Sequence, residues 1–318
     1  MKNRPLLLLL IALLLLNLPA LAHSAEPVPA APDPLLHFAP ATGHVQREPL
    51  LHTPPFAPDA DLLHVVFIDM GMNDAILLES GGQYLLVDGG DWGQNAHVLR
   101  YLREHGIDHI DWMFSTHAHN DHMEGQRRLL SEGIRVGQYF SPYGPNVGLP
   151  KFSKMLKLLD KLGMAPATVQ QGDRMMLGNA QLHFYRNDEF RDTEATQNHA
   201  SMLTRVQFGQ RSLLLSADIS NHSQRVLVKD GRWPLQADIL KSPHHGFNHA
   251  EGAFLEAVDP QLMVITNAPG YAPQLEKQMA ARQIPFFTMG GGNVHLLTDG
   301  NTWYAWQQKT GAPRSWAP

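Results

Sequence analysis

The stretch that decides the fold is Ser115-Thr116-His117-Ala118-His119-Asn120-Asp121-His122, at the end of a strand predicted at residues 110–115. Residues two apart on an extended segment project to the same side, so we expect His117 and His119 to face one metal ion. The chain then turns into a helix, which brings Asp121 and His122 round toward a second position. Imidazole and carboxylate ligands without thiolate suit Zn²⁺, Mn²⁺ or Fe. The alternative interpretation is a histidine-rich surface turn.

Two other segments place metal-binding residue types directly after strands predicted at 212–216 and 237–241. Asp218 follows the first of these strands, where a carboxylate can bridge two cations; its alternative role is to cap the helix predicted from residue 221. The pair His244 and His245 follows the second, within Ser-Pro-His-His-Gly. Ligand sites of α/β proteins gather at such carboxyl ends of strands, so we expect this pair near the first motif.

The composition excludes several classes of site. The chain has 318 residues, 18 His, no Cys and a formal net charge of −5. Without Cys there is no disulfide framework, thiolate zinc site, iron–sulfur cluster or cysteine nucleophile. The weak negative charge argues against tight non-specific binding to nucleic acid, although a local basic groove remains an option. Its candidate residues are Arg127, Arg128, Arg135, Lys151, Lys154 and Lys157. The favoured interpretation of these residues is a solvated helix face.

The first 22 residues have the pattern of a secretory signal peptide. Lys2 and Arg4 precede an apolar run, Leu6 to Leu16, that is shorter than the ~20 residues needed to span a bilayer. Small residues then predict cleavage after Ala22, with an uncleaved anchor as the alternative. We therefore expect a periplasmic or secreted protein without stable membrane insertion after cleavage.

The remaining chain divides into three predicted parts. Residues 23–61 are rich in Pro and Ala, and proline this dense predicts an extended linker without helices or strand ladders. Residues 62–308 form one predicted domain, and residues 309–318 a C-terminal tail. Within the domain, apolar runs rich in β-formers alternate with segments of helical periodicity. This pattern predicts an α/β fold, an αββα four-layer sandwich of two mixed β-sheets flanked by helices.

Taken in order, these motifs resemble the metallo-β-lactamase fold superfamily, and within it the hydrolase domain of the competence protein ComEC and its free-standing relatives. The segments that carry the resemblance are 64–75 (HVVFIDMGMNDA), 86–90 (LVDGG), 115–122, 198–201 (NHAS), 217–218, 238–241 (DILK) and 243–246 (PHHG). The channel segments of the full competence protein are absent from this sequence, so DNA import is not implied.

The resemblance implies two divalent ions, Zn²⁺ in the first place, with Mn²⁺ or Fe as alternatives. It implies His117 and His119 as ligands of the first ion, Asp121 and His122 of the second, Asp218 as the bridge, and either His244 or His245, preferably His245, as the last ligand. It further implies catalytic roles for Asp121 as a proton acceptor and for His244 in contacting substrate or protonating the leaving group, and an orienting role for Asp88. One departure is that no third histidine is evident before Asp218; Asn198 and Ser201 occupy that part of the sequence, and His199 is an alternative ligand.

Three functions remain open at this point. The first is a secreted phosphodiesterase or nuclease-like hydrolase that attacks with a metal-activated water, on a small-molecule or nucleic-acid phosphodiester. The second is a hydrolase of a lactone or another carboxylic ester or amide, and the third a non-catalytic binding protein on the same fold. No protein partner is predicted. Trp92, Tyr143 and Phe247 fall in loops after motif-bearing strands, where they line a pocket or simply pack.

Overall fold

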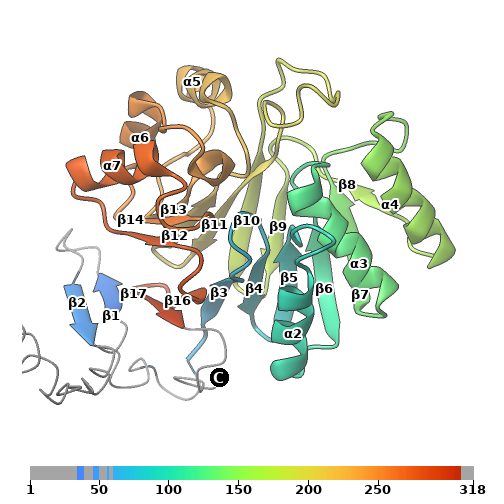
Figure 1. Cartoon of the computed structure of the whole chain (residues 1–318), viewed down its shortest axis with the longest axis horizontal. Helices are drawn as coiled ribbons and strands as arrows, with labels where there is room; N and C mark the ends of the chain where they lie inside the picture. The colour runs from blue at the N-terminus through green and yellow to red at the C-terminus, as the bar shows by residue number, and fades with distance from the viewer. Residues whose placement is uncertain (1–33, 39–45, 50–55, 57–59, 309–318) are drawn as a thin grey trace, which may run out of the picture. The chain divides into compact units, whose positions relative to one another are not determined.

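Two mixed β-sheets face each other across an apolar interior, and helices cover their outer sides (Figure 1). The computed structural model of the chain describes residues 34–38, 46–49, 56 and 60–308. The described residues all belong to one compact unit, Asp33–Pro318. The predicted signal peptide, 1–22, and the predicted tail, 309–318, lie outside the described residues.

The first sheet has ten strands, with parallel pairing from β5 through β8 and antiparallel pairing elsewhere. In spatial order they are β2 (Gln46–Pro49), β1 (Pro34–Phe38), β17 (Trp303–Gln308), β16 (Asn293–Thr298), β3 (Leu63–Phe67), β4 (Ile76–Ser80), β5 (Gln83–Val87), β6 (His109–Phe114), β7 (Arg135–Ser141) and β8 (Ala167–Thr168).

The second sheet has seven strands, and β12 to β15 are parallel. Their spatial order is β15 (Phe286–Thr288), β14 (Leu262–Ile265), β13 (Ile239–Lys241), β12 (Arg211–Leu215), β11 (Leu203–Phe208), β10 (Ala180–Tyr185) and β9 (Arg174–Leu177). The buried parallel strands read as continuous apolar runs, as expected when both faces of a sheet are covered.

Three helices pack on the outer face of each sheet. On the first they are α2 (Ala96–Glu104), α3 (Gly125–Ser131) and α4 (Pro150–Lys161), and on the second α5 (Asn221–Asp230), α6 (Gly252–Val258) and α7 (Pro273–Ala281). One apolar cluster fills the space between the sheets, and a further cluster lies between each sheet and its helices. The predicted four-layer αββα sandwich is therefore confirmed. No helix among the described residues is long and apolar enough to cross a membrane.

The expectation that the proline-rich segment 23–61 forms no strand ladder is wrong at two places. Strand β1 pairs with β17, and β2 pairs with β1 at the edge of the first sheet. The prolines do not prevent this because Pro34 and Pro49 stand opposite each other at the strand ends, and no proline lies inside either strand. Proline is tolerated at strand ends and on edge strands, where no ladder hydrogen bond is lost.

The helix predicted at 121–131 is divided into a π-helical turn, Asn120–Glu124, and the regular helix α3. The join lies at Gly125, whose amide donates to the carbonyl oxygen of Gly90. A side chain at Gly125 would overlap the carbonyl oxygen of Gly89, so the helix can approach this loop only with glycine there. Such π-turns are frequent at functional sites, and this one carries the second half of the histidine motif.

Candidate metal centre

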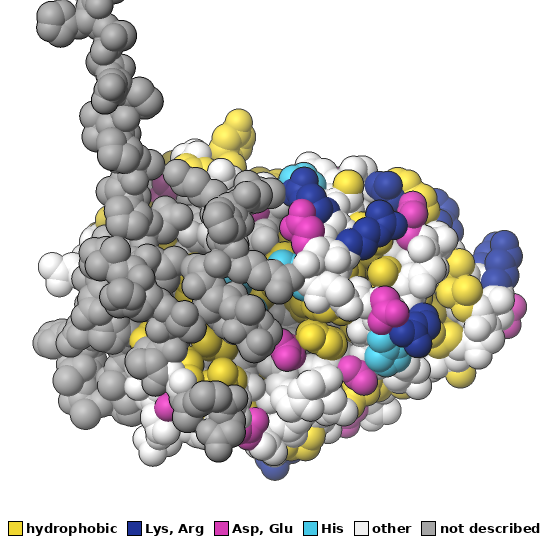
Figure 2. Space-filling model, turned by 90° about the horizontal axis from the view of Figure 1, so that it is seen from below, with side chains coloured by type: hydrophobic (Ala, Val, Ile, Leu, Met, Phe, Trp, Pro, Cys, Tyr) yellow, Lys and Arg dark blue, Asp and Glu magenta, His cyan; other side chains and the backbone are white. Residues whose placement is uncertain are grey.

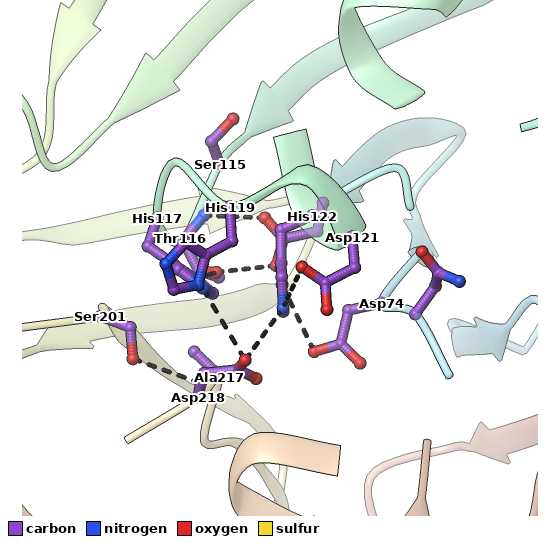
Figure 3. A network of polar contacts seen from close by, with 12 residues as sticks. Asp74, Ser115, Thr116, His117, His119, Asp121, His122, Ser201, Ala217 and Asp218 are labelled. Carbon is purple, nitrogen blue, oxygen red and sulfur yellow. Dashed lines mark hydrogen bonds and ion pairs between the residues drawn. The ribbon is translucent and has the colours of Figure 1, made fainter. Parts of the chain in front are cut away.

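The histidine motif forms the loop between β6 and α3, which the surrounding backbone holds in place (Figure 3). The amide of Ser115 donates to Phe140 on β7, and the carbonyl oxygen of Thr116 accepts from Met202 beside β11. His117 and His122 are fully buried in this loop, whereas the Asp121 side chain is 27% exposed. The loop therefore bridges the two sheets and leaves one side of the motif open.

Asp88, at the end of β5, fixes the orientation of the loop. Its carboxylate accepts the backbone N–H of Thr116 at 2.8 Å, the hydroxyl of Thr116 at 2.7 Å and Nδ1 of His122 at 2.7 Å. Burial raises the pKa of Asp88, against the influence of His122. Because the Thr116 hydroxyl donates to Asp88, its oxygen accepts from Nδ1 of His117, 3.0 Å away. Both histidines thus carry their proton on Nδ1 and turn Nε2 toward the centre, the geometry of an oriented metal ligand.

The second sheet supplies Asp218 after β12 and His245 after β13. Nδ1 of His245 lies 3.1 Å from the Thr266 hydroxyl, so its Nε2 also points inward. Oδ2 of Asp218 lies 3.2 Å from Nε2 of His122, 3.4 Å from Nε2 of His245 and 3.8 Å from Nε2 of His117. Segments far apart in the sequence therefore place three imidazole nitrogens around one carboxylate oxygen.

The spacing of these atoms fits a metal ion. Donor atoms ~2.1 Å from a tetrahedral zinc ion lie about 3.4 Å from one another. Nε2 of His122 and Nε2 of His245 are 3.2 Å apart, and Oδ2 of Asp121 is 3.5 Å from Nε2 of His245. On the other side of Asp218, Nε2 of His117 lies 3.0 Å from Nδ1 of His119.

The electrostatics of the cluster also favour a cation. Burial opposes charging of His245, but Asp218 and Asp74 outweigh it and raise the pKa of His245 to about 10. The same balance, with Asp218 and Asp88, raises the pKa of His122 well above its ordinary value. A buried site that attracts protons this strongly has a negative potential suited to a divalent ion.

Sequence reasoning missed the pairing of Asp74 with Lys241. Lys241, the last residue of β13, is fully buried, and its Nζ lies 2.5 Å from Oδ2 of Asp74 and 3.5 Å from Oδ1 of Asp218. Its amine also donates to the carbonyl oxygen of Ala217 at 2.9 Å. A lysine that ends an otherwise apolar strand was the available indication, because a buried ammonium requires a carboxylate partner.

Four groups of three His or Asp residues come close enough to hold an ion among the described residues. Two of them include Asp74, whose Oδ2 already faces Lys241, and one of these also includes Asp88, which is saturated by hydrogen bonds. The remaining groups are His117–His122–Asp218 and Asp121–His122–His245. They coincide with residues singled out in the sequence.

His244 lies beside this cluster and on its open side. Its side chain is 32% exposed, and Nε2 lies 3.9 Å from Oδ2 of Asp218 and 3.1 Å from the amide nitrogen of Asn198. Ser201 accepts from the backbone N–H of Asp218 at 3.2 Å, so Asn198 and Ser201 support the site from the β10–β11 loop. His199 points elsewhere: it contacts Ser220 and stacks on Phe190.

The three aromatic residues considered as pocket lining differ in exposure. Tyr143 is buried, and its oxygen accepts from the N–H of Ala118, so it packs against the histidine loop. Phe247 is 47% exposed, with its ring 5.1 Å from that of His244. Trp92 is 41% exposed and is covered on one side by the guanidinium of Arg127 at 4.3 Å.

Comparison with known proteins agrees with this geometry. Residues 68–134 match the family model described as the metallo-beta-lactamase superfamily. The solved structure of CmlA, a diiron β-hydroxylase from Streptomyces venezuelae, is 18% identical with a TM-score of 0.50, over 76% of this chain and 54% of CmlA. The chain thus spans about half the length of that protein, and at this identity the similarity shows the fold alone.

Two further structures are similar at lower TM-scores. YhfI from Bacillus subtilis, a metallo-beta-lactamase fold protein, is 13% identical with a TM-score of 0.49, over 77% of this chain and 99% of YhfI. A diphosphatase of the PhnP family is 16% identical with a TM-score of 0.46, over 74% of this chain and 98% of that protein. No curated protein matches the chain. The segment that matches the metallo-beta-lactamase superfamily model contains the whole histidine motif, and the chain shares its fold with CmlA.

Proposed function

We propose that this chain is a secreted or periplasmic hydrolase that binds two divalent ions and uses an activated water to cleave a phosphodiester. The observation that carries the proposal is the convergence of imidazole Nε2 atoms from both sheets on Oδ2 of Asp218. The secretion part rests on the sequence pattern of residues 1–22.

Each candidate ion has its own ligands in this arrangement. His117, His119 and Asp218 would hold the first, and Asp121, His122, His245 and Asp218 the second. When bound, two such ions, most simply Zn²⁺, would supply a water activated near neutral pH and positive charge to stabilise the developing oxyanion.

The protein's own groups perform the remaining tasks. Asp88 keeps Nε2 of His122 turned inward, and Asn198 holds His244 at the open side of the site. From there His244 contacts the substrate next to the leaving group, and Asp121, partly exposed, accepts a proton.

The phosphodiester part of the proposal rests on the resemblance to ComEC-like hydrolases, and the charge distribution favours a small substrate over a polymer. Three residues of the candidate basic groove are paired with acidic side chains: Arg127 with Glu124, Arg128 with Glu132, and Arg135 with Asp108. Figure 2 shows the molecule from below, and on that one face Lys and Arg side chains are interspersed with Asp and Glu side chains. A nucleic-acid groove would need a continuous basic stripe.

The test combines metal analysis with a substrate panel. The purified protein should contain close to two equivalents of a transition metal and hydrolyse bis(4-nitrophenyl) phosphate faster than lactones or β-lactams. His119→Ala should lose metal and activity, whereas His199→Ala, a histidine of the neighbouring loop that points away, should keep both. A wild type without metal, or an unimpaired His119→Ala, would contradict the enzyme assignment. Hydrolysis of lactones alone would replace the phosphodiester with the carboxylic alternative.

A further inference from the structure

The buried lysine at the end of β13 has no role in the reaction described above. Lys241 is fully inside the protein, directly behind the candidate metal ligands. Its ammonium lies 2.5 Å from Oδ2 of Asp74 and 3.5 Å from Oδ1 of Asp218, and it donates to the carbonyl oxygen of Ala217. Two carboxylates therefore compensate this buried charge, which would be strongly destabilising without them.

The two oxygens of Asp218 face different surroundings. Oδ2 faces the nitrogens of His117, His122 and His245. Oδ1 is buried, makes no hydrogen bond, and lies 3.5 Å from the ammonium of Lys241. The lysine is therefore placed to orient the carboxylate and to leave a single oxygen for the histidine side.

The buried carboxylates around the site need positive charge to compensate them. Asp74, Asp88 and Asp218 are all buried within this region. Lys241 is the one Lys or Arg that forms an ion pair with any of these carboxylates among the described residues. Without it, the partners of positive charge left to Asp74 and Asp218 would be the buried histidines His122 and His245 and any bound metal ion.

We propose that Lys241 is a fixed counter-ion of the metal site, which neutralises Asp74 and orients Asp218 so that the ligands keep their arrangement before metal binds. This inference rests on the proposed metal site. It predicts that loss of the lysine makes stability depend on metal, because a bound divalent ion then has more uncompensated negative charge to neutralise.

The experiment compares thermal unfolding of the full chain with and without Zn²⁺, after chelator treatment, in the wild type and Lys241→Met. Breaking a buried ion pair in a domain of this size should lower the metal-free Tm by on the order of 10 °C. Zn²⁺ should then raise the Tm of the variant by more than it raises that of the wild type. An equal or smaller rise, or an unchanged metal-free Tm, overturns the proposal.

Two further variants separate the charge role from simple destabilisation. Arg211→Met removes a comparably buried cation, paired with Asp238 at 3.3 Å and at the opposite end of β12, so its Zn²⁺-induced rise should equal that of the wild type. The double variant Lys241→Met with Asp74→Asn removes both charges and should recover part of the lost metal-free Tm.

The remaining outcomes are also decisive. If Lys241→Met does not fold, the double variant decides: recovery of folding supports the counter-ion role, and continued failure overturns it, because the shape of the lysine would then matter more than its charge. If Zn²⁺ leaves the wild-type Tm unchanged and a competing chromophoric chelator detects no binding, the proposed metal site fails. The metal-free comparison of the wild type with the three variants still tests the charge role in that case.

Discussion

Acid should destabilise this protein through a histidine pair far from the metal centre. His64 on β3 and His295 on β16 are adjacent in the first sheet, with Nε2 of His64 3.1 Å from Nδ1 of His295. Both rings stack with Trp306, and Nε2 of His295 is buried without a hydrogen bond. Burial, together with the charge of His105, lowers the pKa of His64 from 6.5 to about 3, and burial likewise lowers the pKa of His295 well below its ordinary value.

The sign and size of the effect follow from proton linkage. Below pH 6.5 the unfolded chain protonates both histidines, whereas the folded protein keeps His64 neutral down to about pH 3. Each group that binds its proton only in the unfolded state lowers the free energy of unfolding by about 1.4 kcal/mol per pH unit. Between pH 6.5 and pH 5 this amounts to about 2 kcal/mol for His64, and His295, whose pKa is also lowered well below its ordinary value, acts in the same direction. Stability is thus complete above pH 6.5 and falls as the pH decreases toward 3.

Urea unfolding of metal-free protein at pH 7.5, 6.5, 5.5 and 5.0 measures this dependence. In the double variant His64→Leu with His295→Leu, the free energy of unfolding should fall much less between pH 6.5 and pH 5 than it does in the wild type. His109→Leu, which replaces a histidine whose side chain is 42% exposed, serves as the control and should follow the wild type. Glu79 stands opposite His64 on β4. In the competing outcome, protonated His64 pairs with the Glu79 carboxylate, and this pair offsets the destabilisation by acid. If the double variant and the wild type show the same pH dependence, the reasoning from burial is wrong.

Two further predictions concern the support of the histidine loop. Gly125→Ala places a methyl group onto the carbonyl oxygen of Gly89 and should lower the free energy of unfolding, measured by urea titration, by more than about 3 kcal/mol. Gly144→Ala is the control, because a Cβ there meets no atom within 4 Å, and it should change the free energy of unfolding by less than about 0.5 kcal/mol. Thr116→Val removes the hydroxyl that donates to Asp88 and should weaken metal binding about 10- to 100-fold in a chelator competition. An unchanged metal affinity would show that the backbone N–H of Thr116 suffices to orient Asp88.

The elements of this fold were predictable because their patterns are local. Apolar runs of five or six residues locate the strands of the domain, and helical spacing locates the six helices described, each to within a few residues. The strands β1 and β2 were not predictable, because β1 pairs with β17, more than 250 residues away, and β2 joins the sheet only through β1. Proline density misled the expectation, since what matters is where each proline falls relative to the ladder.

The candidate ligands were predictable from type and spacing, but their supporting contacts were not. Asp74 and Lys241 meet only when the β3–β4 loop of one sheet and β13 of the other are brought together. The contact between Asn198 and His244 likewise joins two loops separated by 46 residues. Such pairs cannot be read from sequence periodicity, because periodicity locates each element separately and does not show which elements come into contact.

The choice between His244 and His245 shows how a backbone constraint decides a side chain's direction. Both residues have positive φ, 46° and 52°, a conformation that is rare outside glycine and costs free energy. The next residue, Gly246, also has positive φ, and a Cβ there would press on Ala272 and Leu275. Three successive left-handed residues turn the chain sharply under α7, which buries His245 with Nε2 toward Asp218 and leaves His244 at the open side. The strained turn is stabilised by the packing of α7 against it. Gly246, which permits this packing, therefore decides which of the two histidines faces Asp218.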